Sequence, residues 1–548
     1  MVNERQMSST EGSGRHVRPR RAGAGTARGA APAAVVGAGI ALVLVASGIH
    51  AAGGASAAVV GSLGYDPADT GSLSSISRIV GAQGAWAAGY TGAGVDVAVI
   101  DTGVAPVPGL DAAGKVITGP DLSFDSPGAA TPGLDAFGHG TFMAGLIAGR
   151  DAGVQASASG CTTCLNSSGY SDTTAFVGIA PDARIVNVKV GAADGAADVT
   201  QVIAGIDWVV QHAHDPGLNI RVISLSYGTD SAQDSSVDPL AQAAEQAWRH
   251  GIVVVAASGN DGKKSKQLAD PGYDPFLIAV GGDDPHGTLT VSDDTVSTFA
   301  EHGNTHRPVD VTAPAAHVIG PRVPGGFVDT LAGNTGQVGT RFQRGSGTSQ
   351  ATAIVAGVAA LVLQKYPAAA PDQVKALLNA TATKLSSGNA NAPGQLVHWG
   401  HGIVNAATAV TTALPTGAQT GSASTGTGTL DATRNGVDVV AGTVPLKGQK
   451  DIFGQPFSSS GMAAAQAGAS AWNGGVWNGS RWSGDSWSGS RWSSAAWTGT
   501  DWAGSRWSGS RWSGMAWDGS RWSGSGWGSS QWTGSGWDGS RWSSWSTS

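Results

Sequence analysis

Three short segments carry the residue types that nucleophilic acyl transfer requires. Asp101 ends an apolar run, His139 stands between two glycines ahead of the apolar run 142–148, and Ser349 precedes the apolar run 351–363. A serine hydroxyl becomes a strong nucleophile when a histidine accepts its proton and an acid orients that histidine. Singly, these residues could be a turn-forming Asp, a packed core His and a helix-capping Ser. Their order and their small neighbours favour an acyl-transfer site.

Strand and helix patterns alternate around these segments. The expected strands are Val95–Ile100, Arg184–Val190, Ile220–Leu225, Gly251–Ala257 and Phe276–Val280, and the expected helices between them include Asp198–His212 and Pro239–His250. Largely apolar strands suit a parallel sheet that is covered on both faces. The alternation predicts an α/β fold with a doubly wound, mostly parallel sheet and helices on both faces. Ligands bind at the carboxyl ends of strands in such sheets, so we expect the chemistry there.

Residues 80–412 resemble the subtilisin-like serine proteases, or subtilases. The motifs that carry the resemblance are VIDTG (99–103), HGTFMAG (139–145), ISLSYG (223–228), AASGN (256–260), VTAP (311–314), GTSQATA (347–353) and GHGIVNAATAV (400–410). The chain order Asp, His, Ser is that of subtilisin. The resemblance implies a subtilisin-like fold and a serine endopeptidase that works through an acyl-enzyme.

The resemblance also implies the role of each matching residue. Ser349 would be the nucleophile, His139 the base that later protonates the leaving amine, and Asp101 the acid that orients the imidazole. Asn260 would donate a hydrogen bond to the oxyanion, together with the backbone N–H of Ser349. Phe142, which follows the HGT motif, and Gln350, which follows the nucleophile, depart from the common family pattern without changing a catalytic atom.

Two further segments match the substrate-binding parts of the family. The first would bind an extended substrate as an added strand, and it comprises Ser226, Tyr227 and Gly228. The second would line the pocket for the residue before the cleaved bond, and it comprises Ala256, Ala257, Ser258 and Gly259. The opposite wall of that pocket has no sequence signal, so the substrate preference stays open.

The N-terminus has the pattern of an export signal. Residues 1–30 contain six Arg and two Glu, an uncharged apolar stretch follows, and Ala55-Ser56-Ala57 is a candidate cleavage site. We therefore expect a secreted or cell-surface protein. The alternative is a retained signal, in which case residues 31–52 would anchor the protein in the membrane.

The predicted organisation has five parts. These are a signal peptide or anchor (1–57), a short pro-segment or linker (58–77), the peptidase domain (78–412), a linker rich in Gly, Ser and Thr with a short apolar patch (413–470) and a Trp-rich tail (471–548). Many subtilases carry a folding prodomain of some 70 residues, whereas only about 20 residues separate Ala57 from the start of this domain. Either the domain folds without one, or 58–77 is its remnant.

Cys161 and Cys164 are the only cysteines, so a four-thiolate zinc site is excluded. An exported protein would join them in a small loop disulfide, and a redox motif is the alternative. The chemistry requires no cofactor and no catalytic metal. Structural Ca²⁺ is implied only by the resemblance, since no twelve-residue calcium loop is present.

The tail repeats every five residues. Trp recurs in this register from Trp472 to Trp542, within units such as W-S-G-S-R. Along one extended strand, successive Trp side chains would alternate between faces; a solenoid of such units is a second possibility. Aromatic faces and Arg side chains suit stacking on sugars, so the tail is expected to bind cell wall or surface polysaccharide, or else to act as a spacer.

The leading hypothesis is an exported serine endopeptidase that acts on polypeptides as a monomer. The formal charge of −7 argues against a general nucleic-acid partner. Two alternatives are a catalytically restrained surface-binding protein on a subtilase scaffold and a membrane-held processing protease.

Overall fold

The computed structural model describes residues 62–488, apart from gaps at 127–131, 158–160, 162, 168–169, 171, 263–266, 334–335, 385–398, 437, 442–443 and 483–486. The expected signal or anchor (1–57, including 31–52) and the Trp repeats beyond residue 488 lie outside the described residues. Among the helices that the structure describes, none combines the length and apolarity needed to cross a membrane.

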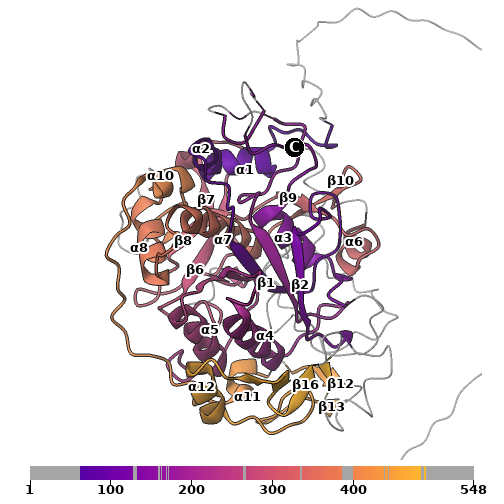
Figure 1. Ribbon diagram of the computed structural model, residues 1–548, viewed down its shortest axis with the longest axis vertical. Coiled ribbons are helices and arrows are strands. Elements are labelled where there is room, and N and C mark those ends of the chain that lie inside the picture. Colours follow the sequence, from indigo (N-terminus) through magenta and orange to yellow (C-terminus); the bar gives the residue numbers. More distant parts are fainter. Residues whose placement is uncertain are drawn as a thin grey trace, which may run out of the picture. The chain divides into compact units, whose positions relative to one another are not determined.

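A central, mostly parallel sheet organises the described part of the chain (Figure 1). Its strands are β1 (Asp96–Asp101), β2 (Val116–Asp121), β3 (Arg184–Lys189), β4 (Ile220–Leu225), β5 (Val253–Ala257), β6 (Ile278–Asp284), β7 (Thr295–Val296) and β8 (Val311–Pro314). The strand order is β2-β3-β1-β4-β5-β6-β7, β8 pairs with β6, and only the β6–β7 pair is antiparallel. The order reverses on either side of β1, which places the switch point at the strand that ends in Asp101. The predicted α/β fold is confirmed.

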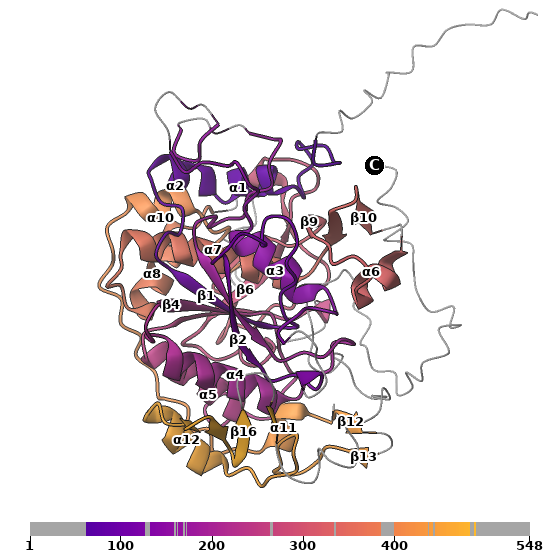
Figure 2. The same ribbon diagram turned by 45° about the vertical axis from the view of Figure 1, so that its right-hand side comes forward.

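Helices cover both faces of this sheet (Figures 1 and 2). α3 (His139–Ala148) and α7 (Thr348–Lys365) pack together on one face, and α4 (Val199–His212) and α5 (Pro239–Arg249) pack together on the other. Every residue of α7 from Thr348 to Leu363 is buried, as expected of a helix that is apolar all round. The sequence patterns therefore located the main helices, whose apolar sides decide their packing.

Shorter elements complete the domain. They are α1 (Leu73–Ile79), α2 (Ala82–Ala87), β9 (Val318–Pro321), α6 (Phe327–Ala332), β10 (Gln337–Val338), β11 (Phe342–Gly345), α8 (Pro371–Thr381) and α10 (Ala406–Thr411). The segment expected as a pro-segment or linker, 58–77, is packed into the domain from residue 62 onward. Leu73 and Ile76 are buried, and the N–H of Ile319 in β9 donates to the carbonyl of Gly71 at 2.7 Å.

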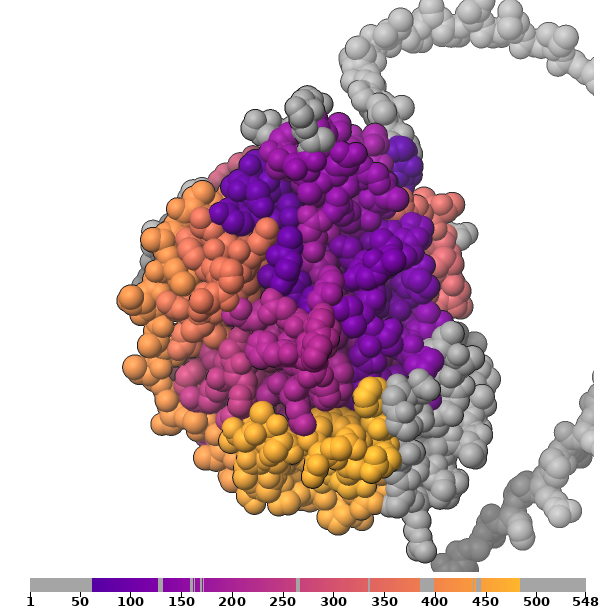
Figure 3. Space-filling view, in the orientation of Figure 1, coloured from indigo at the N-terminus to yellow at the C-terminus, as the bar shows by residue number. Residues whose placement is uncertain are grey.

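The C-terminal extension, residues 413–488, first passes α8 and then lies against α4 and α5 (Figures 1 and 3). It contains α11 (Leu430–Arg434), β12 (Val440–Ala441), β13 (Val444–Pro445), α12 (Ser459–Ala467) and the strands β14 (Trp472–Asn473), β15 (Val476–Trp477), β16 (Ser480–Trp482) and β17 (Trp487–Ser488). Its first part differs from the flexible linker that its composition predicts. The N–H of Gln419 donates to Asp372, and the N–H of Ser424 donates to the buried Glu245 at 2.7 Å. Because the side chains here are small, the backbone N–H groups can approach and bond to carboxylates of the domain.

The first pentapeptide units form an antiparallel meander, β14-β15-β16-β17. The chain reverses at Gly474-Gly475 and at Asn478-Gly479, where all four residues have positive φ, as two-residue hairpin loops require. Trp472 and Trp477 pair across neighbouring strands and are buried against α4, donating from Nε1 to the carbonyl of Ala204 and to the carboxylate of Asp207. These units are therefore part of the core, rather than the single extended strand considered from the sequence.

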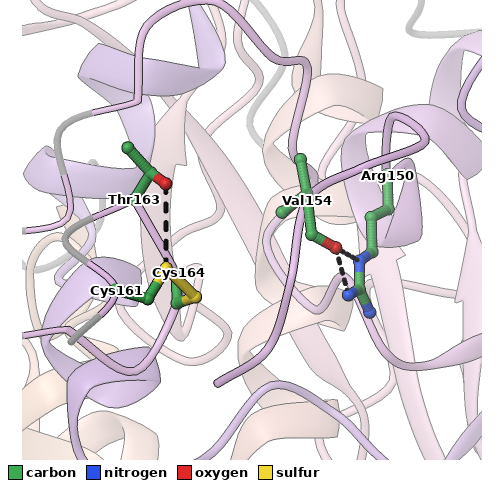
Figure 4. The surroundings of a disulfide bond; sticks show 5 residues. All are labelled: Arg150, Val154, Cys161, Thr163 and Cys164. Atoms are coloured by element: carbon green, nitrogen blue, oxygen red, sulfur yellow. Dashed lines mark hydrogen bonds between the residues drawn. A yellow bond between two sulfur atoms is a disulfide. The ribbon is translucent and has the colours of Figure 1, made fainter. Parts of the chain in front are cut away.

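A disulfide joins Cys161 and Cys164 in a surface loop (Figure 4). Thr163 contacts the sulfur of Cys161 at 3.7 Å, and Arg150 donates from Nε to the carbonyl of Val154 at 3.0 Å nearby. The bridge spans only three positions, so it stiffens this loop without linking distant parts of the fold.

Candidate active site

Asp101 and His139 form a direct pair at the carboxyl edge of the sheet. Asp101 is the last residue of β1, and His139 is the first residue of α3. The Nδ1 atom of His139 lies 2.9 Å from both carboxylate oxygens of Asp101, and both side chains are buried. An acid in this position fixes the ring and its tautomer, which leaves Nε2 available as a base.

Burial sets the protonation of this pair. It lowers the pKa of His139 well below the usual value, so the imidazole is neutral at neutral pH. Burial also raises the pKa of Asp101, and the hydrogen bond from the N–H of Thr102, at 2.7 Å, opposes that rise. The ionised carboxylate is the form that can accept from both Thr102 and the imidazole. A neutral base held by an acid can take a proton from a nearby hydroxyl.

Asp135 holds this arrangement in place, and sequence reasoning missed it. Its carboxylate accepts hydrogen bonds from the hydroxyl of Thr102, from the N–H groups of Phe137 and Gly138, and from both the N–H and the hydroxyl of Thr141. It thereby joins the turn after β1 to the first turn of α3. The only signal was an Asp just before a helix start, which is a common capping position.

Ser349 lies in the first turn of α7, and its N-terminal neighbour connects it to Asn260. Thr348 donates from its backbone N–H to Oδ1 of Asn260 at 3.0 Å, and from its hydroxyl at 3.1 Å. The Nδ2 atom of Asn260 is buried and has no hydrogen-bond partner among the described residues. The amide is thus fixed by its oxygen while its nitrogen keeps its donors, as an oxyanion donor must.

The two predicted substrate segments lie at the same edge of the sheet. Ser226 directly follows β4, and its hydroxyl donates to the carbonyl of Ser349 at 3.4 Å. Tyr227 is buried, and a Cβ on Gly228 would meet the side chain of Ala269. The first segment therefore runs beside the start of α7.

The second segment begins in β5 and continues beyond it. Ala256 and Ala257 end the strand, and the N–H of Ser258 donates to Val280 of β6 at 3.1 Å. Gly259 has φ of +108°, and a Cβ there would collide with the carboxylate of Glu301. The segment leads into Asn260, so the structure brings these four residues to the neighbourhood of Thr348 and Ser349.

α6 forms a wall next to His139 that the sequence did not predict. The N–H of Phe327 donates to Ala136 at 2.9 Å, and the N–H of Val328 donates to Phe137 at 3.0 Å. The rings of Phe137 and Phe327 stack with centroids 5.4 Å apart. The loop before His139 is therefore supported from outside the sheet.

The described residues contain no group of three or more His, Cys, Asp or Glu side chains arranged to hold a metal ion. Calcium binding remains an expectation from the family. The arrangement above uses a base, an acid and hydrogen-bond donors of the chain itself, and such groups can perform acyl transfer unaided.

A model of the Subtilase family matches residues 92–441. The chain belongs to this family. Serine protease AprX of Bacillus subtilis is 36% identical over 327 residues, which cover 58% of this chain and 67% of that relative. Subtilisin DY of Bacillus licheniformis is 32% identical over 321 residues, which cover 58% of this chain and 92% of that relative. This subtilase is a serine-type endopeptidase.

Subtilisin Savinase of Lederbergia lenta is 32% identical over 335 residues and covers 60% of this subtilase and 96% of its own length. The crystal structure of a cold adapted subtilisin-like serine proteinase matches with 28% identity and a TM-score of 0.40, over 58% of this subtilase and 88% of that chain.

Proposed function

We propose that this subtilase is an exported endopeptidase in which Ser349, His139 and Asp101 form the catalytic triad. The Oγ of Ser349 attacks the peptide carbonyl and His139 accepts its proton. His139 then protonates the leaving amine, and water hydrolyses the resulting acyl-enzyme through the same base. Asp101 stays ionised, orients His139 and stabilises the imidazolium form.

The orientation of the Asn260 amide is the observation that carries this proposal. Thr348 holds its oxygen from two atoms, whereas its buried nitrogen keeps its donors. A purely structural Asn would be expected to satisfy both ends, because a buried N–H without an acceptor is costly. An oxyanion formed at the carbon that Ser349 attacks would supply the acceptor, and the backbone N–H of Ser349 would be the second donor.

We propose further that an extended polypeptide binds along Ser226–Gly228 as an added strand. The backbone of this segment directly continues β4, and the hydroxyl of Ser226 donates to the Ser349 carbonyl. Backbone pairing of this kind gives affinity without sequence preference, and side-chain pockets add the preference. Ala256–Gly259 is the proposed pocket wall.

Labelling with a fluorophosphonate probe tests the triad. Such probes react only with an activated serine, so the wild-type protein should be labelled and the Ser349→Ala variant should not. Ser346→Ala is a matched control, because Ser346 lies three positions before Ser349. Its hydroxyl accepts a hydrogen bond from the N–H of His317, which is outside the proposed triad. Labelling that survives in Ser349→Ala, or a folded wild type that stays unlabelled, would contradict the proposal.

Export to a secreted or cell-surface location is the second part of the proposal. The disulfide between Cys161 and Cys164 supports it, because disulfides persist in oxidising compartments. N-terminal sequencing of the exported protein should give a start near Ala58. A start that retains the apolar run at residues 31–52 would instead indicate a membrane-held protease.

Binding of cell wall or surface polysaccharide by the Trp-rich tail remains a proposal for the later repeats. Trp472 and Trp477 are buried against α4, so they are not available for stacking on sugars. Retention of the full chain, but not of a chain that ends at residue 488, by insoluble cell wall would support adhesion. Equal retention would leave the tail as a spacer. Light scattering of the same preparations tests the proposed monomer.

A further inference from the structure

Two loops leave the edge of the sheet that carries the candidate active site. Loop 190–198 joins β3 to α4, and its first two N–H groups, from Val190 and Gly191, donate to the carbonyl of Asp101. Loop 226–238 joins β4 to α5 and begins with the proposed substrate segment. The conformation of both loops therefore bears on the shape of the substrate-binding edge.

Each loop ends in a buried Asp that caps the following helix. Asp198 accepts from the N–H of Thr200 at 2.9 Å, and Asp238 accepts from the N–H of Leu240 at 2.7 Å. A capping carboxylate fixes where the loop stops and the helix begins. The position of these two carboxylates thus determines where each loop must end.

Two consecutive residues of α11 bind both of these carboxylates. Arg434 donates from Nε and Nη2 to the two oxygens of Asp198, at 2.7 and 3.1 Å. Thr433 donates from its hydroxyl to Asp238 at 2.9 Å. Arg434 is 2% exposed and Asp198 1%, so this bidentate ion pair is shielded from solvent.

The chain around α11 also follows the backbone of loop 226–238. Backbone bonds join Ala232 to Ala432, at 2.9 Å, and Gly428 to Val237, at 2.6 Å. Further bonds between the two segments include those from the Thr425 N–H and hydroxyl to Ser236, from the Ser424 hydroxyl to Ser235 and from the Asn435 amide to Asp230. Loop 226–238 is therefore bonded along most of its length to residues 424–435.

We propose that residues 424–435 are a latch that positions the two loops bordering the substrate-binding edge, with Arg434 and Thr433 as its positioning residues. The proposal rests on the proposed function, in that it assigns these loops to the binding of extended substrate. Arg434 also donates to the carbonyls of Gly448 and Lys450, so the latch is itself held by the rest of the C-terminal extension. The latch acts on substrate only through the loops.

The test uses a double variant that removes both charges of the ion pair, and a single variant that removes one donor from Asp238. In the single variant Asp238 stays buried and keeps the hydrogen bonds from Ser231, Gln233 and the N–H of Leu240. In the double variant Asp198→Asn/Arg434→Met, Asn keeps the helix cap and Met keeps the apolar stem, so the ion pair is lost with both charges. Thr433→Val removes the other hydroxyl and keeps its shape. Arg481→Ala is the matched control, because Arg481 belongs to the same extension and donates to Gly474 within its own small sheet.

Hydrogen exchange of the full chain gives the first readout, and it needs no activity. Loop 190–198 should exchange at least about tenfold faster in the double variant, and loop 226–238 likewise in Thr433→Val, while β1, β4 and β5 stay unchanged. Uniform acceleration over the whole domain, or no change in either loop, would overturn the latch. Arg481→Ala should leave both loops as in wild type.

The second readout separates the latch from general stability. We expect the variants to lower kcat/KM for an extended peptide at least about tenfold, while the rate of fluorophosphonate labelling, which needs only the triad, changes less than about twofold. If kcat/KM and the labelling rate fell by similar factors, residues 424–435 would only support the fold, and the proposal would be overturned. Wild type that fails to label would instead reject the proposed function, and the exchange data would still decide the latch.

Discussion

Asn260 offers the sharpest test at the level of single residues. Removing one oxyanion donor from subtilisin lowers kcat by about 10²–10³, and Asn260→Ala should have an effect of that size here with KM nearly unchanged. The physical reason is that the donor meets full negative charge only in the transition state. Steady-state kinetics on a peptide substrate checks this. Asn473→Ala, an exposed Asn of β14, is the control, and a change confined to KM would contradict the assignment.

The environment of His139 predicts the acid limb of the pH profile. Burial lowers its pKa well below 6.5, and the base must be neutral to act. We therefore expect kcat/KM to hold as the pH falls through 6.5 and to decline only at lower pH. The unfolded chain protonates this His near 6.5, so His139 also makes folding less stable as the pH falls below that value. An activity midpoint above pH 6.5 would be inconsistent with the buried pair.

Sequence reasoning found the residues that motifs mark and missed those that only geometry reveals. Asp101, His139 and Ser349 each lie within two residues of a glycine, and Asp101 ends an apolar run while the other two precede one. This placement is visible in the sequence. Asp135 is an ordinary loop Asp in the sequence, and its five accepted hydrogen bonds depend on how the turn after β1 meets α3. Such long-range pairing leaves no local pattern.

At the level of secondary-structure elements, the contact between α4 and the meander predicts how stability depends on pH. Burial raises the pKa of Asp207 to about 7, and the hydrogen bond from Trp477 only partly opposes this. Because the folded state then holds a proton that the unfolded state releases near pH 3.8, stability falls as the pH rises from about 4 to about 7.

Asp207→Asn should remove that part of the pH dependence. The Asn oxygen can still accept from Trp477, and the variant should be more stable than wild type at pH 8 by up to about 4 kcal/mol. Urea unfolding between pH 5 and pH 8 measures the difference. Asp215→Asn, on the exposed turn after α4, is the control. If the free energy of unfolding of wild type and of Asp207→Asn changed equally with pH, a buried acid at this contact would be contradicted.

The elements of the sheet could be predicted, and those of the C-terminal extension could not. β1, β3, β4 and β5 are largely apolar runs, and this composition predicts burial on both faces of the sheet. α11 has five residues and the strands of the meander two or three, too few for periodicity to appear. The Asn478-Gly479 dipeptide was a usable hairpin signal that the five-residue period obscured.

At the scale of the whole molecule, truncation tests whether the C-terminal extension belongs to the folding unit. A chain that ends at residue 412 leaves the buried carboxylates of Asp198, Asp238 and Glu245 without Arg434, Thr433 and the N–H of Ser424. Loss of a buried partner destabilises by about 3–5 kcal/mol for an ion pair alone, a large fraction of the total stability of a domain.

We therefore expect the chain ending at 412 to yield little folded protein, and a chain ending at 488 to unfold at nearly the temperature of the full-length protein. Thermal unfolding and soluble yield check both. A stable, fully folded chain that ends at 412 would show that the C-terminal extension is accessory to the fold.

The separation between the latch and its targets has a consequence for biosynthesis. Thr433 lies 195 positions after Asp238, and Arg434 lies 236 positions after Asp198. A ribosome completes α3 and α7, which carry His139 and Ser349, before it makes the residues that hold loops 190–198 and 226–238. On the proposed function, a nascent or prematurely terminated chain can therefore contain Asp101, His139 and Ser349 and still lack the latch. If the latch acts as proposed, its synthesis, rather than that of the triad residues, sets when this protease can first bind an extended polypeptide.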